Sequence, residues 1–217
     1  FSTPASAALA WSPNHASRCG PLPTSTSGWT GSGSDVGRGF NPAACVPGVS
    51  PGAWRARTGC YHRLMNPADC ILFSGGAPGA EAAFGESAER HGVEEVNFTF
   101  EGHKMARHRG VRVLNHEELQ SGDISLEYVS RLMHRRYTDA PTIRRVLQTL
   151  WYQVNHGQEI YVIGAILDDD TVRGGTGWGA EFAKLCNKPL FVFDQDRDGW
   201  FEWTGNAWAP RRGADAP

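Results

Sequence analysis

Two glycine-rich motifs contain the residues of this chain that are best suited to chemistry. The first occupies residues 74–81 (SGGAPGAE) and the second occupies residues 174–181 (GGTGWGAE). Glycine allows a tight turn and a close approach of a ligand to the backbone, and the N–H groups that begin a following helix attract an anion such as phosphate. Either motif alone also suits a plain packing turn, but two of them in one sheet favour a phosphate site.

The hydrophobic pattern from about residue 60 onward predicts alternating strands and helices. Apolar residues at three- and four-residue spacing are clearest after Pro141, which suits a first helical turn. The expected strands are 70–73, 96–100, 160–166 and 189–194, and the expected helices are 80–91, 126–133, 141–156 and 178–186. This order predicts an α/β fold with a Rossmann-like, doubly wound, mainly parallel sheet and a C-terminal β-hairpin. Both glycine turns would then lie at the carboxyl edge of the strands, where ligands bind.

Residues 1–60 differ in composition from the rest and are expected to form an irregular arm. The first fifty residues contain only three charged side chains and are rich in Ser, Thr, Ala, Gly and Pro, so they bury little apolar area. The scattered aromatic residues either belong to a flexible tail or pin the arm to the folded body or to a partner. These residues are Trp11, Trp29, Phe40 and Trp54. The expected division is therefore the arm, an α/β domain at 61–210 and a tail at 211–217.

The composition of the whole chain excludes several classes of function. The formal charge is −2, from 21 basic and 23 acidic residues, so general nucleic-acid binding is not expected. The longest apolar run is far shorter than the roughly 20 residues of a transmembrane helix. The cysteines show no zinc-ligand spacing, and we expect neither a metal nor a cofactor. A disulfide among Cys19, Cys45 and Cys60 is left open.

The N-terminal residue is Phe rather than Met, and the residues after it are rich in Ser and Ala and poor in acids. This start suggests a processed or cropped chain. It fits the remains of an organelle-targeting segment.

The second motif resembles the SLOG superfamily, which includes the lysine-decarboxylase-like LOG proteins. Gly174, Gly175, Gly177 and Glu181 match the family motif GGxGTxxE, whereas Trp178 stands where Thr is usual. The first glycine turn is also similar to that of the superfamily, and the likeness extends over some 130 residues. The resemblance implies a Rossmann-like fold that binds a nucleotide or a nucleotide-derived ligand, and it implies a homodimer. Some LOG members hydrolyse the N-glycosidic bond of a nucleoside 5′-monophosphate.

The candidate site residues follow from the motifs, the resemblance and a basic stretch at 101–109. The catalytic candidate is Glu181, which would orient a hydroxyl or water or stabilise an oxocarbenium-like transition state; the alternative is a carboxylate placed only by the helix dipole. Trp178 either stacks on a base or fills the core. The other candidate ligand-binding residues are Ser74, Gly75, Gly76, Gly79, Lys104, Arg107, Gly174, Gly175, Thr176 and Gly177. For Lys104 and Arg107, the alternative is a solvated loop.

Three functions remain open on the sequence. The leading hypothesis is a SLOG-like protein that binds a nucleotide-like small molecule and hydrolyses it, which Glu181 at the motif spacing favours. The rival is a non-catalytic accessory subunit of a larger complex, docked through residues 1–60, which Trp178 and the long arm favour. The third is a sensor domain that binds a nucleotide signal without turnover.

Overall fold

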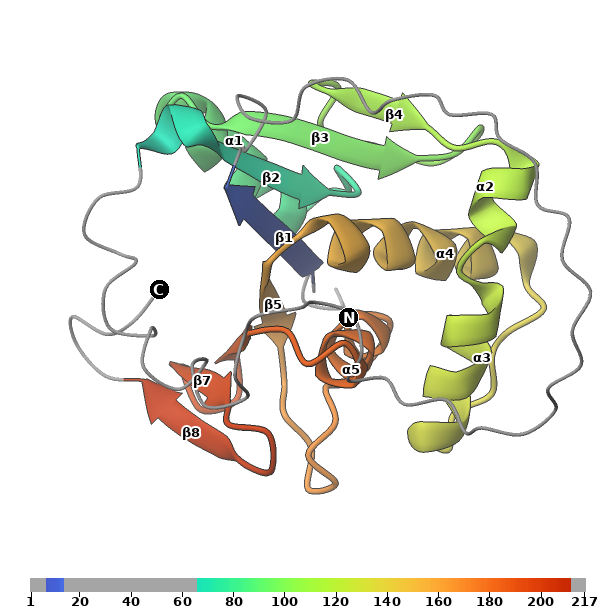
Figure 1. Ribbon diagram of the computed structural model, residues 1–217, viewed down its shortest axis with the longest axis vertical. Helices are drawn as coiled ribbons and strands as arrows, with labels where there is room; N and C mark the ends of the chain where they lie inside the picture. The colour runs from blue at the N-terminus through green and yellow to red at the C-terminus, as the bar shows by residue number, and fades with distance from the viewer. Residues whose placement is uncertain (1–6, 14–65, 212–217) are drawn as a thin grey trace, which may run out of the picture. The chain divides into compact units, whose positions relative to one another are not determined.

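The computed structural model describes residues 7–13 and 66–211, which belong to one compact unit of α/β architecture (Figure 1). Most of the arm expected at 1–60, together with Cys19, Cys45 and Cys60, lies outside the described residues. Within the part of the chain that is described, no helix has the length and apolar character needed to cross a membrane.

Eight strands form one sheet in the order β4-β3-β2-β1-β5-β6-β7-β8. The strands are β1 (Ala7–Pro13), β2 (Cys70–Ser74), β3 (Glu94–Thr99), β4 (Val111–Val113), β5 (Glu159–Gly164), β6 (Leu190–Asp194), β7 (Gly199–Trp203) and β8 (Trp208–Arg211). On one side of β1, the strands β2, β3 and β4 pair in parallel. On the other side, β5 and β6 pair in parallel, and β7 and β8 continue antiparallel. A parallel three-stranded group and a mixed four-stranded group therefore flank β1.

Two expectations about the sheet are corrected. Four of its seven strand pairs are antiparallel, so the sheet is mixed rather than mainly parallel. Ala7–Pro13, which was expected to be irregular, forms β1 and is antiparallel to both β2 and β5. The segment lacks the alternation that marks a strand in a sequence, but strand formation depends strongly on partners, and here two neighbouring strands supply them. The predicted C-terminal hairpin is confirmed as β7 and β8.

The helices follow the local sequence closely. They are η3 (Pro67–Asp69, a 3₁₀ turn), α1 (Ala80–Arg90), α2 (His116–Gln120), α3 (Asp123–Leu132), α4 (Pro141–His156) and α5 (Thr176–Leu185). In α4, the residues Leu147, Leu150 and Val154 are buried at a spacing of three and four, and Pro141 occupies the start, where no helical N–H is needed. A capping box of Asn115 and Glu118 begins α2.

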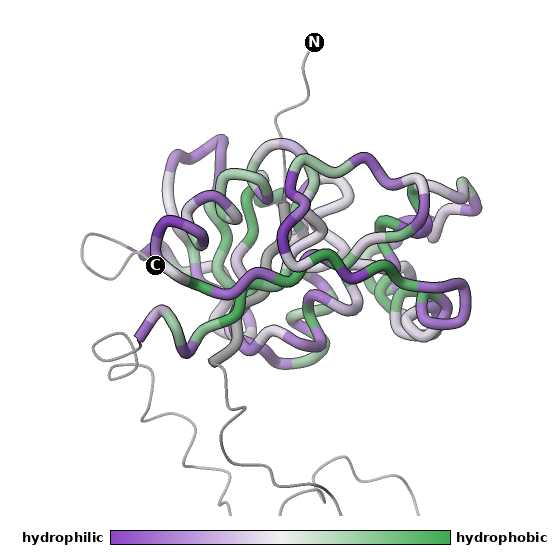
Figure 2. The backbone as a smooth tube through the Cα atoms, turned by 90° about the horizontal axis from the view of Figure 1, so that it is seen from above, coloured by the Kyte–Doolittle hydropathy of each residue, from purple (hydrophilic) through white to green (hydrophobic). Residues whose placement is uncertain are grey.

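The core lies on both faces of the sheet. Phe73 of β2 belongs to a large cluster with residues of α3, α4 and α5, whereas its neighbour Leu72 packs with Ala88 of α1. Because successive side chains of a strand point to opposite faces, α1 covers one face and α4 and α5, which lie side by side, cover the other (Figure 1). The hydrophilic segments lie mostly at the periphery (Figure 2).

Candidate functional site

Both glycine turns follow the carboxyl ends of strands that run in the same direction. β2 leads through the first turn to α1, and β5 leads through a longer segment and the second turn to α5. The two strands are parallel to each other because each is antiparallel to β1. Only β1 separates them, so they lie about 10 Å apart at the usual strand spacing. The same edge of the sheet therefore carries both turns.

The first turn is closed by its own side chains. The N–H of Gly76 donates to Ser74 Oγ at 3.1 Å, and the N–H of Ala77 donates to Glu81 Oε2 at 2.7 Å. A Cβ built on Gly75 would lie 3.1 Å from both the Gln153 amide and the Glu81 carboxylate. Backbone groups that were expected to hold an anion are thus already bonded to a hydroxyl and a carboxylate of the protein itself.

Glu81 is a buried carboxyl group at this turn. Its exposed fraction is 8%, and burial raises its pKa from 4.5 to about 7, although hydrogen bonds from Ala77, Gly75 and Ser74 oppose that rise. A carboxyl group that titrates near neutral pH is suited to general acid–base chemistry. Glu81 is not among the site residues predicted from the sequence. One signal identifies it, because the pattern Gly-x-x-x-Gly-Ala-Glu occurs twice, at 75–81 and at 175–181.

The segment at 101–110 covers the first turn. The N–H groups of Ala106 and Arg107 donate to the carbonyl of Gly76 at 2.8 and 3.1 Å. The guanidinium of Arg107 donates to Glu95 at 2.7 Å, to Glu89 at 2.9 Å and to the Gly85 carbonyl at 3.2 Å. Arg107 therefore ties this segment to α1 and β3 and has its donors engaged there.

The position of Lys104 differs from that of Arg107. Lys104 lies in the same segment and is exposed to solvent.

Gly79 ends the first turn as the residue before α1, with a φ of 102° that favours glycine.

The second turn is open. A Cβ built on Gly174 or on Gly175 would meet no atom within 4 Å, and both glycines are exposed. Gly174 has a φ of 77°, in the region that favours glycine. Helix α5 begins at Thr176, and the residue before it, Gly175, has no side chain with which to accept the first N–H groups of the helix. This helix start is therefore accessible to an anion.

The residues just inside α5 belong to the core. Trp178 is only 6% exposed, and its ring centroid lies 5.5 Å from that of Tyr137. Of the two roles expected for Trp178, stacking on a base or filling the core, the indole has the second in this structure. A Cβ on Gly177 would lie 2.0 Å from the carbonyl oxygen of Val172. Gly177 thus permits a close approach of α5 to the preceding segment, and it contributes to packing as well as to the turn.

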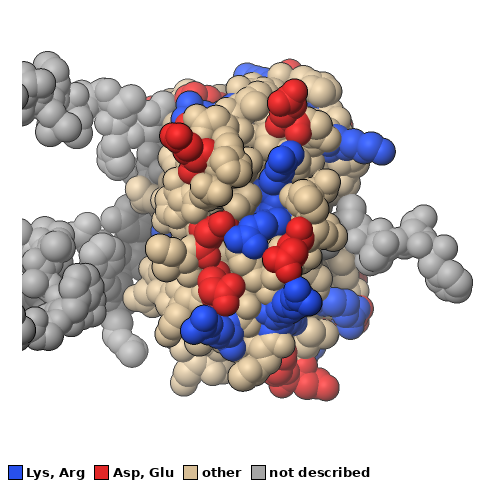
Figure 3. Space-filling model, turned by 90° about the vertical axis from the view of Figure 1, so that its right-hand side faces the viewer, with Lys and Arg blue, Asp and Glu red and all other residues tan. Residues whose placement is uncertain are grey.

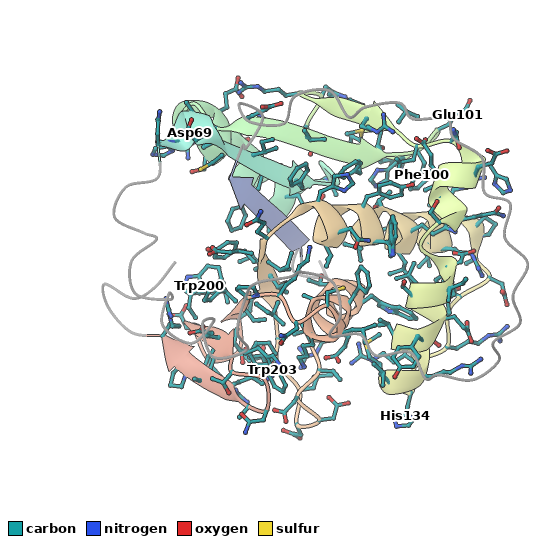
Figure 4. All side chains as sticks on the ribbon, in the orientation of Figure 1. Asp69, Phe100, Glu101, His134, Trp200 and Trp203 are labelled. Atoms are coloured by element: carbon teal, nitrogen blue, oxygen red, sulfur yellow. The ribbon has the colours of Figure 1, made fainter. Side chains whose placement is uncertain are left out.

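Glu181, the catalytic candidate, lies in an ion pair. Its carboxylate is 2.6 Å from Lys184 Nζ, which also donates to the Asp170 carbonyl at 2.8 Å. The ammonium of Lys184 lies 4.1 Å from the ring centroid of Trp203, which Figure 4 shows beside α5. Glu181 therefore faces the hairpin side of the helix and is bonded to a neighbouring cation.

The two glutamates differ because the two helices begin at different points of the shared pattern. Helix α1 begins at Ala80, so Glu81 is its second residue and reaches back to the turn. Helix α5 begins at Thr176, so Glu181 is its sixth residue. The late start of α1 follows from Gly79, whose φ of 102° lies outside the helical region, and from Pro78, which disfavours helical backbone at Ala77.

The described residues contain no group of three or more His, Cys, Asp or Glu side chains placed to hold a metal ion. No protein-family model matches the chain, and neither a curated protein nor a solved structure matches it.

Proposed function

We propose that this chain is a SLOG-like protein with a doubly wound fold that binds a nucleotide or a nucleotide-derived ligand, with the ligand phosphate at the second glycine turn. The observation that carries the proposal is the open start of α5, where Gly174 and Gly175 leave the backbone accessible. The helix dipole favours an anion at such a helix start, where the N–H of Trp178 already donates to the Gly175 carbonyl at 3.1 Å. Thr176, the first residue of the helix, is only 5% exposed, so the accessible part of this turn is the backbone of Gly174 and Gly175.

The rest of the ligand would extend along the carboxyl edge toward the first turn. The ends of β2 and β5 lie about 10 Å apart at the usual strand spacing, which a nucleoside monophosphate can span. If the ligand is hydrolysed, the bond between the base and the anomeric carbon breaks, water supplies the hydroxyl, and the departing base takes a proton. We assign that proton transfer to Glu81 rather than Glu181, because burial brings the pKa of Glu81 to about 7 and Glu181 is paired with Lys184.

The decisive experiment is a calorimetric titration of two glycine variants with a panel of nucleoside 5′-monophosphates. Gly175 has a φ of −64° and space around its Cβ position, so Gly175→Ala should fold normally. Its methyl group would stand where a phosphate must approach the backbone, so we expect at least about a tenfold loss of affinity. The control is Gly199→Ala in β7, where a Cβ meets no atom closer than 3.9 Å, and it should bind as the natural chain does.

Two outcomes would overturn the proposal. One is binding that is unchanged in Gly175→Ala, which would place the phosphate elsewhere. The other is the absence of binding by every nucleotide in the panel. Release of free base from a bound nucleotide would establish hydrolysis, and binding without release would identify a sensor.

An accessory subunit is the second candidate. Two observations favour it: Glu181 is engaged by Lys184, and the amides of the first turn are bonded to Ser74 and Glu81. The predicted docking segment, residues 1–60, lies largely outside the described residues. This function predicts that partner proteins co-purify with the full chain and are lost when residues 1–55 are deleted, with no nucleotide bound by either form.

A further inference from the structure

The first glycine turn already holds a carboxylate, which is the side chain of Glu81. The N–H of Ala77 donates to Glu81 Oε2 at 2.7 Å, and the N–H of Gly75 and the hydroxyl of Ser74 also donate to this group. Backbone N–H groups that converge on a carboxylate at a helix start form the arrangement that binds a free oxyanion. The turn is therefore an anion cradle whose occupant is a side chain of the same chain.

Glu81 is a displaceable occupant of this cradle. Its exposed fraction is 8%, and burial raises its pKa to about 7 although the hydrogen bonds from the turn oppose the rise. Above that pH the ionised carboxylate lacks much of the hydration that it would have in water. It would regain this hydration by turning outward, so the contact with the turn is not the lowest free energy that the side chain can reach.

A second polar group at the same turn is unsatisfied. The side chain of Asn97 is completely buried, and its Nδ2 donates to Glu95 and to the Arg109 carbonyl, both at 2.8 Å. Its Oδ1 accepts no hydrogen bond from the described residues, although it lies 3.1 Å from the Cβ position of Gly76. A buried acceptor without a donor destabilises the state that contains it. Rearrangement of the turn would let water or a ligand donate to Asn97.

Contacts that do not involve the carboxylate keep the turn in place. The carbonyl of Gly76 accepts from the N–H groups of Ala106 and Arg107 at 2.8 and 3.1 Å. A Cβ built on Gly75 would lie 3.1 Å from the Gln153 amide, so the walls of the cradle are close together. The cradle should therefore persist without the side chain that fills it, and the space left would suit a group no larger than a carboxylate.

The surface on this side of the molecule gives an anion no general attraction. Figure 3 shows the side toward which β2 points in Figure 1, with Lys and Arg interspersed with Asp and Glu. An approaching anion meets no continuous basic surface there, so its affinity must come from the N–H groups of a local cradle.

We propose that the first turn is a binding site for a carboxylate ligand, and that the chain keeps this site closed with Glu81 as an autoinhibitory contact. An external carboxylate takes the N–H groups of Gly75 and Ala77, while Glu81 turns outward into solvent. No covalent bond changes. One consequence rests on the proposed function: Glu81 must leave the turn before it can give a proton to a departing base.

The test titrates the full-length Glu81→Ala variant with acetate, followed by calorimetry and by thermal unfolding. Acetate should bind with a dissociation constant of about 1–10 mM, as suits so small a ligand, and should raise the unfolding temperature. The natural chain should bind acetate at least about tenfold more weakly, because Glu81 competes for the same N–H groups. Sodium chloride at the same concentration controls for ionic strength.

Two variants and one ligand serve as matched controls. Glu181→Ala removes the carboxylate of the second turn's pattern, which is bonded to Lys184 rather than to backbone N–H groups, and should not bind acetate. Glu81→Gln keeps an oxygen that can accept from the turn, so it should fill the cradle and exclude acetate. Acetamide, which has the shape of acetate without its charge, should not bind to Glu81→Ala.

Three outcomes would overturn the proposal. They are a folded Glu81→Ala that does not bind acetate, acetate binding that is equal in Glu181→Ala, and acetamide binding that is as tight as acetate binding. If Glu81→Ala is unfolded in dilute buffer, refolding by acetate but not by chloride supports the proposal, and failure to refold overturns it. Because no nucleotide is used, these outcomes are independent of the nucleotide titrations at the second turn.

Discussion

The two glycine turns share a sequence pattern but present opposite surfaces. In the first turn, Ser74 and Glu81 bond the backbone amides, and Met105 and Gln153 crowd the glycines. In the second turn, Gly174 and Gly175 are exposed, and a Cβ built on either would meet no atom within 4 Å. Glycines at a strand–helix junction allow the backbone to approach a ligand, whereas the position of the helix start decides which backbone amides are left unbonded there.

The two turns differ at the fourth residue of the shared pattern. In the first turn, Pro78 disfavours helical backbone at Ala77 and Gly79 has a φ of 102°, so α1 begins at Ala80 and Glu81 lies in its first turn. Trp178 in the second turn is compatible with helix, and its burial against Tyr137 anchors the first turn of α5. Glu181, the acidic residue of this pattern, is therefore the sixth residue of α5 and lies beyond the glycine turn.

The largest expected effect concerns the arginines near the two turns. Arg107→Ala leaves the buried Glu95 carboxylate without its cation, so we expect the free energy of unfolding to fall by about 3–5 kcal/mol. Arg173→Ala, beside the second turn, removes an exposed pair with Asp196 and should cost less than about 1 kcal/mol. Urea denaturation measures both, and equal losses would contradict the contrast between a closed and an open turn.

The next effect is a pH dependence that arises from Glu81. Its pKa in the folded chain, about 7, lies above its usual 4.5, so the folded state binds the proton more tightly. The contribution of Glu81 to stability is therefore greatest below about pH 4.5 and is lost as the pH rises from there through about 7, by roughly 3 kcal/mol. Glu81→Gln should lack this fall, measured by denaturation at a series of pH values. Glu181→Gln is the matched control and should retain the natural profile; a retained profile in Glu81→Gln would assign the dependence to another group.

A smaller effect separates the glycines that have positive φ. Gly76 has a φ of 68°, and a Cβ there would lie 2.9 Å from Met105 and 3.1 Å from the side-chain oxygen of Asn97. Gly174 has a φ of 77° and open space. We expect Gly76→Ala to cost about 2–3 kcal/mol, from backbone strain and crowding, and Gly174→Ala to cost about 1 kcal/mol, from strain alone. Thermal unfolding compares the two, and a larger loss for Gly174→Ala would show that the second turn is not open.

The smallest effect is expected for Glu181→Gln. It weakens the pair with Lys184, which should lower stability by about 1 kcal/mol, and it should leave nucleotide affinity unchanged. Calorimetric titration beside a denaturation curve checks both statements. Loss of binding in a variant that is fully folded would return Glu181 to the site.

Local sequence was sufficient to predict most of the elements. The apolar spacing of α4, the short apolar run of β2 and the aromatic hairpin of β7 and β8 all express short-range preferences, and each formed where it was expected. The position of Ala7–Pro13 could not be predicted in the same way. Its strand depends on pairing with Cys70–Phe73 and Glu159–Ile163, which lie at least 57 residues away in the chain.

The site shows the same division. The places where the backbone is able to turn tightly can be predicted from the residues alone, because glycine and proline act through their own dihedral angles. Which turn has an accessible backbone, and which carboxyl group has a raised pKa, depends on tertiary packing, because burial comes from distant elements. Gln153 of α4 lies against Gly75, and Met105 and Arg107 lie over Gly76. Desolvation and hydrogen bonding depend on what surrounds a group in space, and a pattern of neighbours along the chain does not contain that information.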